Sequence, residues 1–231
     1  MSEYNHIKQL EATIEDQKFA ISKISHEVRN PVTLINSSLQ LIEQEHPEVT
    51  GFAFWNETRA DMNYLIRLLE ELSTYNNGQI LHPEHLSTSK WLKETAASLK
   101  AAVSKNYTFK IDVAEDLPSI TADPVKLRQA LLNLLRNAFE AVSENGFVSL
   151  GAHADATNLT ITVRDNGCGI PPEYLDDLFR PFVTHKSGGT GLGLAITKQI
   201  VNAHRGKIVI HTAPDQGTSF DIVLPLACGK G

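Results

Sequence analysis

The stretch ISKISHEVRNPVTLI, residues 21–35, decides how the first part of the chain folds. It belongs to a seven-residue repeat of β-branched apolar residues, which we call the apolar seam: Ile7, Ile14, Ile21, Val28, Ile35 and Ile42. Such a repeat is typical of a helix that packs along its length against partner helices. It predicts a long helix from about Tyr4 to Glu45, bent at Pro31 because proline removes one helical hydrogen bond.

One histidine lies on the side of this predicted helix that faces away from the apolar seam. His26 occupies that side, Glu27 follows it, and Asn30 lies one turn further on the same face, because residues four apart are neighbours on a helix. An imidazole held outward on a stiff helix is accessible to an external reactant. A single outward histidine is more often an ordinary surface residue, so the rest of the chain must decide between the two interpretations.

A second helix is predicted to follow a short loop and to end at Asn76-Asn77-Gly78. Its own repeat consists of Trp55, Thr58, Met62, Leu65, Leu69 and Leu72. Two helices cannot bury both repeats alone, whereas two copies form a four-helix bundle. We therefore expect residues 1–78 to be an antiparallel helical hairpin that forms a homodimer through these N-terminal helices, with a hinge over 78–88.

The remainder, residues 79–231, changes to short strands mixed with helices. Strands are predicted at 108–113, 147–153, 158–164, 206–211 and 218–224, and helices at 123–142, after Pro172 and at 191–203. Asp123-Pro124 starts the first of these helices, with a capping side chain followed by proline at the first helical position. The order predicts a multi-domain chain whose second part is an α+β sandwich, one sheet covered by helices on a single face.

Composition excludes several classes of function. The 231 residues carry a formal net charge of -6 and no basic block, which argues against binding to nucleic acid or anionic membranes. Cys168 and Cys228 lack disulfide or metal-ligand spacing, which favours a cytoplasmic location. The polar N-terminus is not a signal peptide, and no apolar run approaches the roughly 18 residues of a membrane helix. We expect either a soluble protein or the cytosolic part of a longer one.

The helix that starts at Asp123 carries Asn133 and Asn137 one turn apart, on a stripe separate from its apolar face. Two amides there can be hydrogen-bonded surface groups, or Asn137 can give its side-chain oxygen to Mg²⁺, which takes few protein ligands and fills its shell with phosphate oxygens and water. The second interpretation requires a nucleotide site nearby.

Two glycine-rich stretches can supply that site. In DNGCG, residues 165–169, Asp165 can accept a hydrogen bond from the amino group of adenine, while Gly167 and Gly169 permit close backbone approach. The second stretch opens a helix, and Lys186 lies shortly before it. Backbone N–H groups and the positive end of the helix dipole there suit phosphates; its residues are Gly189, Thr190, Gly191, Leu192 and Gly193.

Taken in order, these segments resemble the boxes of the two-component sensor histidine kinases. Residues 26–31 resemble the H box, 123–140 the N box, 165–169 the G1 box, 179–182 the F box and 189–193 the G2 box. The resemblance implies a dimerisation and histidine phosphotransfer domain over 1–78 and a Bergerat-type ATP-binding domain over 79–231. It also implies Mg-ATP as the phosphoryl donor and the aspartate of a response regulator receiver domain as the final acceptor.

Individual roles follow from the resemblance as hypotheses. His26 attacks the γ-phosphorus with a neutral ring nitrogen, and Glu27 accepts a hydrogen bond from the other nitrogen, which carries the proton. Glu27-x-x-Asn30 resembles the motif with which such kinases dephosphorylate their regulator. Position 133 holds asparagine where ATP-hydrolysing relatives have a glutamate base, so slow hydrolysis is expected. Residues 182–186 resemble nitrogen-regulatory and sporulation kinases.

Two other functions stay open. A phosphorelay or scaffold protein would receive phosphate on His26 from elsewhere and keep an inert second domain. A chaperone-type ATPase of the same fold would need the water-activating glutamate that position 133 lacks. The sequence assigns neither the input signal nor the partner regulator.

Overall fold

The computed structural model describes residues 2–77, 80–100, 107–186 and 188–226, and it describes side chains from Ala20 onward except at Lys100. It divides the chain into two units. The helical unit contains residues 1–77 together with the segment 185–190, and the α/β unit contains residues 78–184 and 191–231. Each unit is described by itself below.

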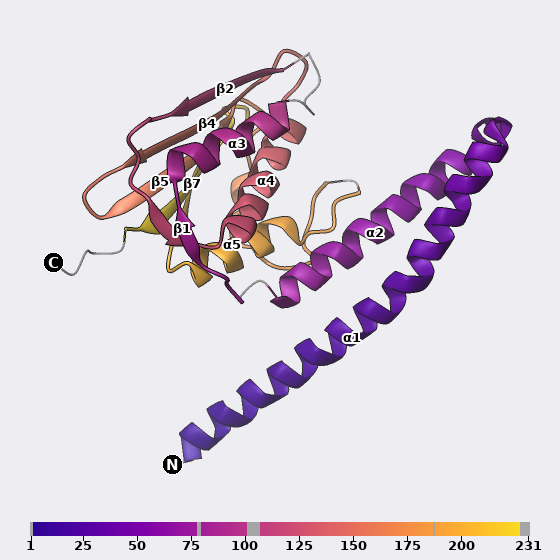
Figure 1. Ribbon diagram of the computed structural model, residues 1–231, viewed down its shortest axis with the longest axis horizontal. Helices are drawn as coiled ribbons and strands as arrows, with labels where there is room; N and C mark the ends of the chain where they lie inside the picture. The colour runs from indigo at the N-terminus through magenta and orange to yellow at the C-terminus, as the bar shows by residue number, and fades with distance from the viewer. Residues whose placement is uncertain (1, 78–79, 101–106, 187, 227–231) are drawn as a thin grey trace. The chain divides into compact units, whose positions relative to one another are not determined.

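The helical unit consists of two long helices joined by a short turn. Helix α1 covers Ser2–Glu45, a 3₁₀ turn η1 covers Pro47–Gly51, and α2 covers Trp55–Asn77. The expected first helix is therefore present. It remains helical through Pro31, and its axis changes direction along its length (Figure 1).

One face of α1 packs against α2. Its buried or half-buried residues recur at alternating intervals of three and four, and they are Ser22, Ser25, Arg29, Val32, Asn36, Leu39 and Glu43. Polar contacts fix the pair: Arg29 Nη2 donates to the carbonyl oxygen of Leu69 at 3.2 Å, and Arg59 Nη1 donates to Asn36 Oδ1 at 2.9 Å. Arg59 also forms an ion pair with Glu43 at 3.4 Å.

The apolar seam is a different face of α1 from the one that contacts α2. In the single chain Ile21 is 39% exposed, Val28 42% and Ile35 50%. The earlier seam residues Ile7 and Ile14 lie outside the described side chains. One copy of the hairpin thus leaves its β-branched stripe open to solvent, although water contact with such a stripe is unfavourable.

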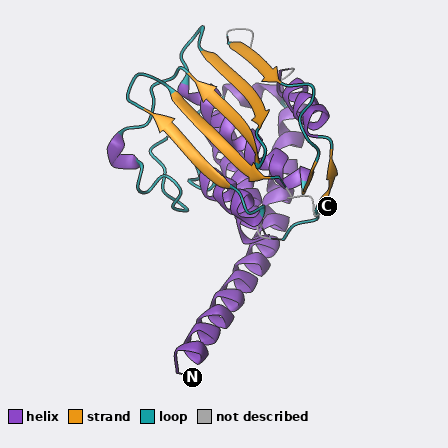
Figure 2. Cartoon of the chain, turned by 90° about the vertical axis from the view of Figure 1, so that its left-hand side faces the viewer, coloured by secondary structure: helices purple, strands orange, loops and turns teal. Residues whose placement is uncertain are grey.

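The α/β unit is built on a five-stranded sheet with the order β2-β4-β5-β7-β6. Its strands are β2 (Thr108–Val113), β4 (Phe147–Ala154), β5 (Asn158–Asp165), β6 (Lys207–Thr212) and β7 (Thr218–Pro225). β2 and β4 are parallel, while the other neighbouring pairs are antiparallel. Helices α3 (Thr88–Lys100), α4 (Pro124–Ala141) and α5 (Gly193–Ala203) lie behind one face of this sheet (Figure 2). A 3₁₀ turn η2 covers Pro172–Tyr174. The expected α+β sandwich is confirmed.

The expected hinge over 78–88 is wrong for its second half. Strand β1 (Glu84–Leu86) pairs antiparallel with β3 (Ile120–Ala122), and α3 begins at Thr88. The buried hydroxyl of Thr88 donates to the carbonyl oxygen of Pro118 at 2.6 Å. The sequence did not predict β1 or β3, because three-residue strands are too short to display a period, and it also did not predict the 13-residue helix α3.

The core of this unit lies between the sheet and the helices. Alternate residues of β5 point into it, and Leu159, Ile161 and Val163 are each at most 1% exposed. Leucines of α4 and isoleucines of α5 meet them: Leu127, Leu131, Leu134, Leu135, Ile196 and Ile200. Asp165 continues the alternation of β5, since side chains two apart on a strand share a face. Its carboxylate therefore enters the layer that holds α4 and α5.

Candidate functional site

The predicted phosphorylation site lies on the solvent side of α1. The side chains of His26, Glu27 and Asn30 are all exposed. At roughly 100° per residue, His26 projects about opposite the apolar seam and well away from the face that contacts α2. Among the described side-chain interactions, none joins His26 to Glu27, so the proton-accepting role of Glu27 stays a prediction.

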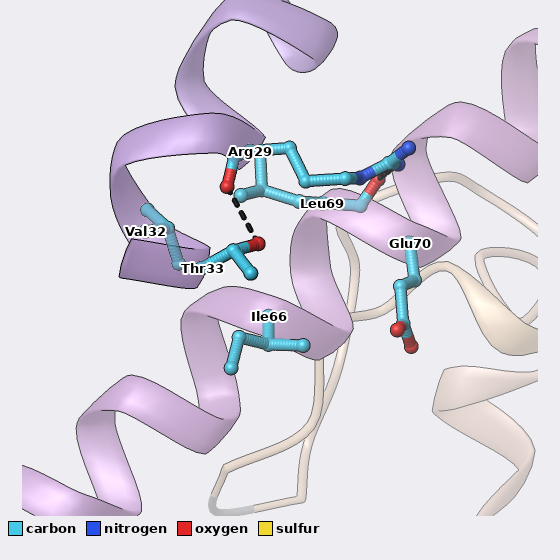
Figure 3. A pocket seen from close by; sticks show the side chains of 6 residues that line it. All are labelled: Arg29, Val32, Thr33, Ile66, Leu69 and Glu70. Atoms are coloured by element: carbon cyan, nitrogen blue, oxygen red, sulfur yellow. Dashed lines mark hydrogen bonds between the residues drawn. The ribbon is translucent and has the colours of Figure 1, made fainter. Parts of the chain in front are cut away.

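A small cleft lies one turn beyond His26 within the helical unit (Figure 3). It holds about 60 Å³, and its walls come from α1 and α2: Arg29, Val32, Thr33, Ile66, Leu69 and Glu70. The hydroxyl of Thr33 donates to the carbonyl oxygen of Arg29 at 2.8 Å across its α1 wall. Small-molecule sites usually hold about 300–1,000 Å³, so this cleft is too small for a nucleotide.

Asp165 is the centre of a buried polar cluster at the end of β5. It is 5% exposed, and its Oδ1 accepts hydrogen bonds from the backbone N–H groups of Gly167 at 2.8 Å and Thr218 at 3.2 Å. The hydroxyl of Thr212 lies 3.0 Å from that of Thr218 and accepts from the N–H of Ile170 at 2.9 Å. These contacts fix the carboxylate in one orientation, as recognition of a purine edge requires.

The backbone at the two glycines after Asp165 lies close to other backbone segments of this chain. A Cβ atom on Gly167 would lie 2.4 Å from the carbonyl oxygen of Ala141 at the end of α4. Gly169 has φ +69°, and a Cβ there would lie 2.0 Å from the carbonyl oxygen of Ala213. Glycine is therefore required at both positions to close the loop around Asp165, independently of any ligand.

Helix α4 presents its two asparagines differently from the expected exposed stripe. Asn133 is 6% exposed: its Nδ2 donates to the carbonyl oxygen of Gly193 at 3.1 Å, and its Oδ1 accepts from Arg136 Nη2 at 3.2 Å. Asn137 is half-buried and Glu140 is exposed. Asn133 thus joins α4 to the start of α5, while Asn137 is the more accessible of the two amides.

The second glycine-rich stretch opens α5. Gly191 has φ +71°, and its carbonyl oxygen accepts from the N–H of Phe182 at 3.0 Å. Leu192 is fully buried and precedes the helix without a capping side-chain hydrogen bond. The first turn of α5 therefore presents the positive end of a helix dipole, which suits an anionic ligand.

The remaining predicted site residues fall in the segment 185–190. Lys186 is exposed, and its carbonyl oxygen accepts from the N–H of Gly189 at 3.2 Å. The hydroxyl of Thr190 donates to the carboxylate of Glu71, a contact inside the helical unit as defined above.

Bound magnesium is compatible with these residues. In the described part of the chain, no group of three or more histidine, cysteine, aspartate or glutamate side chains is placed to hold a metal by itself. A site in which Asn137 gives one oxygen and a nucleotide gives the others would not need such a group.

Sequence reasoning missed three contributors to this region: Thr212, Thr218 and Arg136. The two threonines lie at the facing ends of β6 and β7, where they are paired in register. Thr218 meets Asp165 because β7 is the antiparallel neighbour of β5, and Thr212 lies against Thr218. A threonine at a strand end gives no signal of such a role until the strand order is known.

Over the residues described, no helix is both long and apolar enough to cross a membrane.

Several known proteins are similar to this chain in sequence. Residues 122–227 match the family described as histidine kinase-, DNA gyrase B-, and HSP90-like ATPase. The chain is 31% identical over 206 residues to the signal transduction histidine-protein kinase AtoS of Escherichia coli, covering 88% of this chain and 34% of AtoS. It is 33% identical over 205 residues to sporulation kinase A of Bacillus subtilis, covering 87% and 33% respectively. It therefore spans about a third of the length of these relatives.

Solved structures agree with the fold. Full-length ShkA in complex with AMPPNP superposes with a TM-score of 0.76 at 26% identity, over 90% of this chain and 46% of ShkA. The histidine kinase ThkA in complex with the response regulator TrrA gives 0.69 at 25% identity, over 97% of this chain and 67% of ThkA. Residues 122–227 thus form a domain of the GHKL-type ATPase family, and in sequence and fold the chain as a whole is similar to the two-component sensor histidine kinases.

Proposed function

We propose that the chain is an ATP-dependent protein histidine kinase, an ATP:protein-L-histidine phosphotransferase that phosphorylates its own His26. The phosphoryl group then passes to an aspartate in the receiver domain of a response regulator. The observation that carries this proposal is the exposed imidazole on a helical unit, in the same chain as an ATPase-family domain with a buried, oriented Asp165. Relatives of this kind bind an ATP analogue and a response regulator respectively.

The residues that the sequence predicts for nucleotide binding would each contact a different part of the nucleotide. Asp165 would accept the adenine amino group, and the loop of Gly167 and Gly169 would border the ring. The stretch 189–193 and Lys186 would approach the phosphates, with Asn133 holding the start of α5, and Asn137 would give its oxygen to Mg²⁺. Bound magnesium would neutralise the charge on the phosphate oxygens during transfer.

His26 supplies the nucleophile in this proposal. One neutral ring nitrogen forms a bond to the γ-phosphorus, and the bond from that phosphorus to the bridging oxygen breaks, leaving its electron pair on ADP. The other ring nitrogen carries the proton, and Glu27 is proposed to accept a hydrogen bond from it as positive charge develops on the ring. Exposure of His26 matters because the imidazole must meet a nucleotide and later an aspartate on another protein.

Position 133 favours transfer to histidine over hydrolysis. An amide cannot accept the proton of an attacking water, and the side chain of Asn133 already bonds Gly193 and Arg136. Steady-state hydrolysis should therefore be slow, with the nucleotide spared for His26. Rapid turnover of ATP without labelling of the protein would contradict this part of the proposal.

We assign the dimerisation and phosphotransfer role to residues 1–78 and the catalytic role to residues 79–231. The exposed apolar seam supports a homodimer, because a second hairpin would cover the β-branched stripe that one copy leaves open. The proposed setting is the cytoplasm. Asn30, exposed one turn from His26, is proposed to orient water toward the phosphorylated aspartate of the regulator, which would add a phosphatase activity.

The central test is incubation of the full chain with γ-labelled Mg-ATP. Wild-type protein should acquire label that is lost in acid and retained in base, as expected of phosphohistidine. His26→Ala should lose all label and still bind ATP. His46→Ala is the matched control, because His46 is also an exposed histidine of the helical unit, and its label should be unchanged. Unlabelled wild type that binds ATP would indicate a relay or scaffold protein instead.

The phosphatase role has its own test in Asn30→Ala. Autophosphorylation should survive, whereas dephosphorylation of the cognate regulator should fall. Equal loss of both activities would assign Asn30 to general helix structure.

A further inference from the structure

A second polar cluster of the α/β unit lies at the start of α4, away from the residues assigned to the nucleotide. Asp123, the N-cap of α4, is 3% exposed. Its Oδ1 accepts from the N–H groups of Val125 at 3.0 Å and Lys126 at 2.9 Å, and its Oδ2 accepts from the N–H of His82 at 2.8 Å. The carboxylate therefore holds both the first turn of α4 and the chain segment that leads into this unit.

The backbone of Asp123 also contacts the far end of α5. Its N–H donates to Nε2 of His204 at 3.0 Å, and Nδ1 of the same ring lies 2.8 Å from the carbonyl oxygen of Ile200. An N–H donor at Nε2 requires that nitrogen to be unprotonated, so Nδ1 must carry the proton and donate it to Ile200. The two contacts together specify a single neutral tautomer of His204.

Helices α4 and α5 are thus joined at two places with a common spacing. At the nucleotide end, the carbonyl oxygen of Gly193 accepts from Asn133 Nδ2 at 3.1 Å and from the hydroxyl of Thr197 at 2.9 Å. Asp123 and Asn133 are ten residues apart, and Gly193 and His204 are eleven apart. At about 1.5 Å of rise per residue, the distance along α4 from Asp123 to Asn133 and the distance along α5 from Gly193 to His204 agree within about 2 Å. The helices run antiparallel between these ties.

We propose that His204 is a positioning residue for nucleotide binding. Its imidazole fixes the register of α5 on α4 and thereby holds Gly193 against Asn133 at the other end of the helix pair. The proposal rests on the proposed function, since it assumes that the first turn of α5 receives the phosphates. His204 itself contacts no nucleotide in this proposal; it acts only through Asp123 and the two helices.

The register matters because apolar packing holds α4 and α5 together without setting the direction of any donor, whereas a hydrogen bond ties one turn of α5 to one turn of α4 in a defined geometry. The N–H groups of α5 do not tolerate a shift of that helix, because a ligand held by several donors loses affinity steeply when their geometry changes by about 1 Å. The tie at His204 therefore holds the end of α5 that lies away from the Gly193 contact.

The test compares three substitutions in the full chain. His204→Gln keeps an acceptor near the position of Nε2, His204→Asn keeps only a group near Nδ1, and His204→Leu keeps neither. We expect the Kd for Mg-ATP, measured by calorimetry, to rise about tenfold in the Asn and Leu variants and to stay within about twofold in the Gln variant. His153→Leu is the matched control, because His153 is exposed on β4, and its Kd should be unchanged.

Two spectroscopic readouts do not depend on activity. In nucleotide-free wild type, ¹⁵N spectra at neutral pH should show Nε2 of His204 unprotonated and Nδ1 protonated. The side-chain amide resonance of Asn133 should shift in the Asn and Leu variants and not in the Gln variant. If the Leu variant fails to unfold cooperatively, the Asn and Gln variants decide the question between them.

Three results would overturn the proposal: the Nε2–H tautomer in the wild type, an unchanged Asn133 resonance in folded Asn and Leu variants, or equal ATP affinity in all three variants. Failure of the proposed kinase function would look different from these results, because the wild-type protein would then carry no label on His26. The tautomer of His204 and the Asn133 resonance would still test the role of His204 in that case.

Discussion

The helical unit and the α/β unit differ in how far they bury their apolar side chains. In the α/β unit, Ile161 and Leu131 are each 1% exposed, and the sheet and its helices enclose them within one chain. In the helical unit, Ile24 is 59% exposed and Ile35 50%, although both lie on or beside the apolar seam. Among the residues described, the α/β unit encloses its large apolar core within one copy, whereas the helical unit leaves several large apolar side chains exposed.

This difference fits the two halves of the proposed chemistry. A nucleotide site requires donors and acceptors held rigidly, and Asp165 obtains its fixed orientation from the buried layer between sheet and helices. A phosphoryl acceptor must instead be displayed. His26 projects from a helix whose other faces are committed to α2 and, in our proposal, to a second copy. Four predictions test this comparison.

The largest effect on stability is expected from Ile161→Ala in the centre of the sheet. Removing a fully buried isoleucine side chain leaves a cavity and should destabilise the α/β unit by about 2–5 kcal/mol. Urea unfolding of the full chain measures this loss, and sedimentation equilibrium should show unchanged self-association. Loss of association in a still-folded variant would contradict the independence of the two units.

The next effect concerns the apolar seam, where Ile35→Glu should weaken self-association. A carboxylate enclosed between helices without a partner costs about 2 kcal/mol or more, so the Kd of the homodimer should rise at least about thirtyfold. Sedimentation equilibrium measures it. Leu34→Glu, an equally drastic change at a 70% exposed position outside the seam, is the control. Equal weakening by both variants would mean that the seam is not the dimer contact.

A smaller effect is expected at the start of α4, from Asp123→Ala. Burial opposes ionisation of this carboxyl group, but hydrogen bonds from the backbone N–H groups of His82, Lys126 and Val125 lower its pKa below the ordinary 3.8. Loss of the cap should destabilise the α/β unit by about 1–2 kcal/mol at neutral pH.

The pH dependence of Asp123→Ala has a defined sign. A carboxyl group with a lowered pKa stabilises the fold fully above its unfolded pKa, and this contribution disappears as the pH falls through the folded pKa. The stability difference between wild type and variant should therefore be constant at neutral pH and shrink below about pH 4. Unfolding measured across this range checks it; a difference that grew toward acid would contradict the assignment.

The smallest effect is expected at Val125, also in the first turn of α4. This valine is 73% exposed, so Val125→Ala should change the free energy of unfolding by no more than about 0.5 kcal/mol. Urea unfolding alongside Asp123→Ala makes the comparison. A larger loss would show that a partner surface covers this residue.

Local sequence signals were sufficient wherever a segment had a clear period or a capping residue. The cap at Asp123, strand β2 and the two long helices follow from the pattern alone. The signals failed at β1 and β3, which are three residues long and exist only through their pairing with each other. They also failed for Asn133, which a helical stripe placed on an exposed face but which the start of α5 covers.

The sequence by itself determined the class of each domain and the residues able to carry the chemistry, because period, caps and glycine placement depend on near neighbours in the chain. Only the tertiary structure decided what surrounds those residues. It placed Thr218 at Asp165, Gly193 at Asn133 and His204 at Asp123, and these contacts join residues 53 to 81 positions apart in the chain. Such contacts depend on how strands and helices pack, which no local pattern encodes.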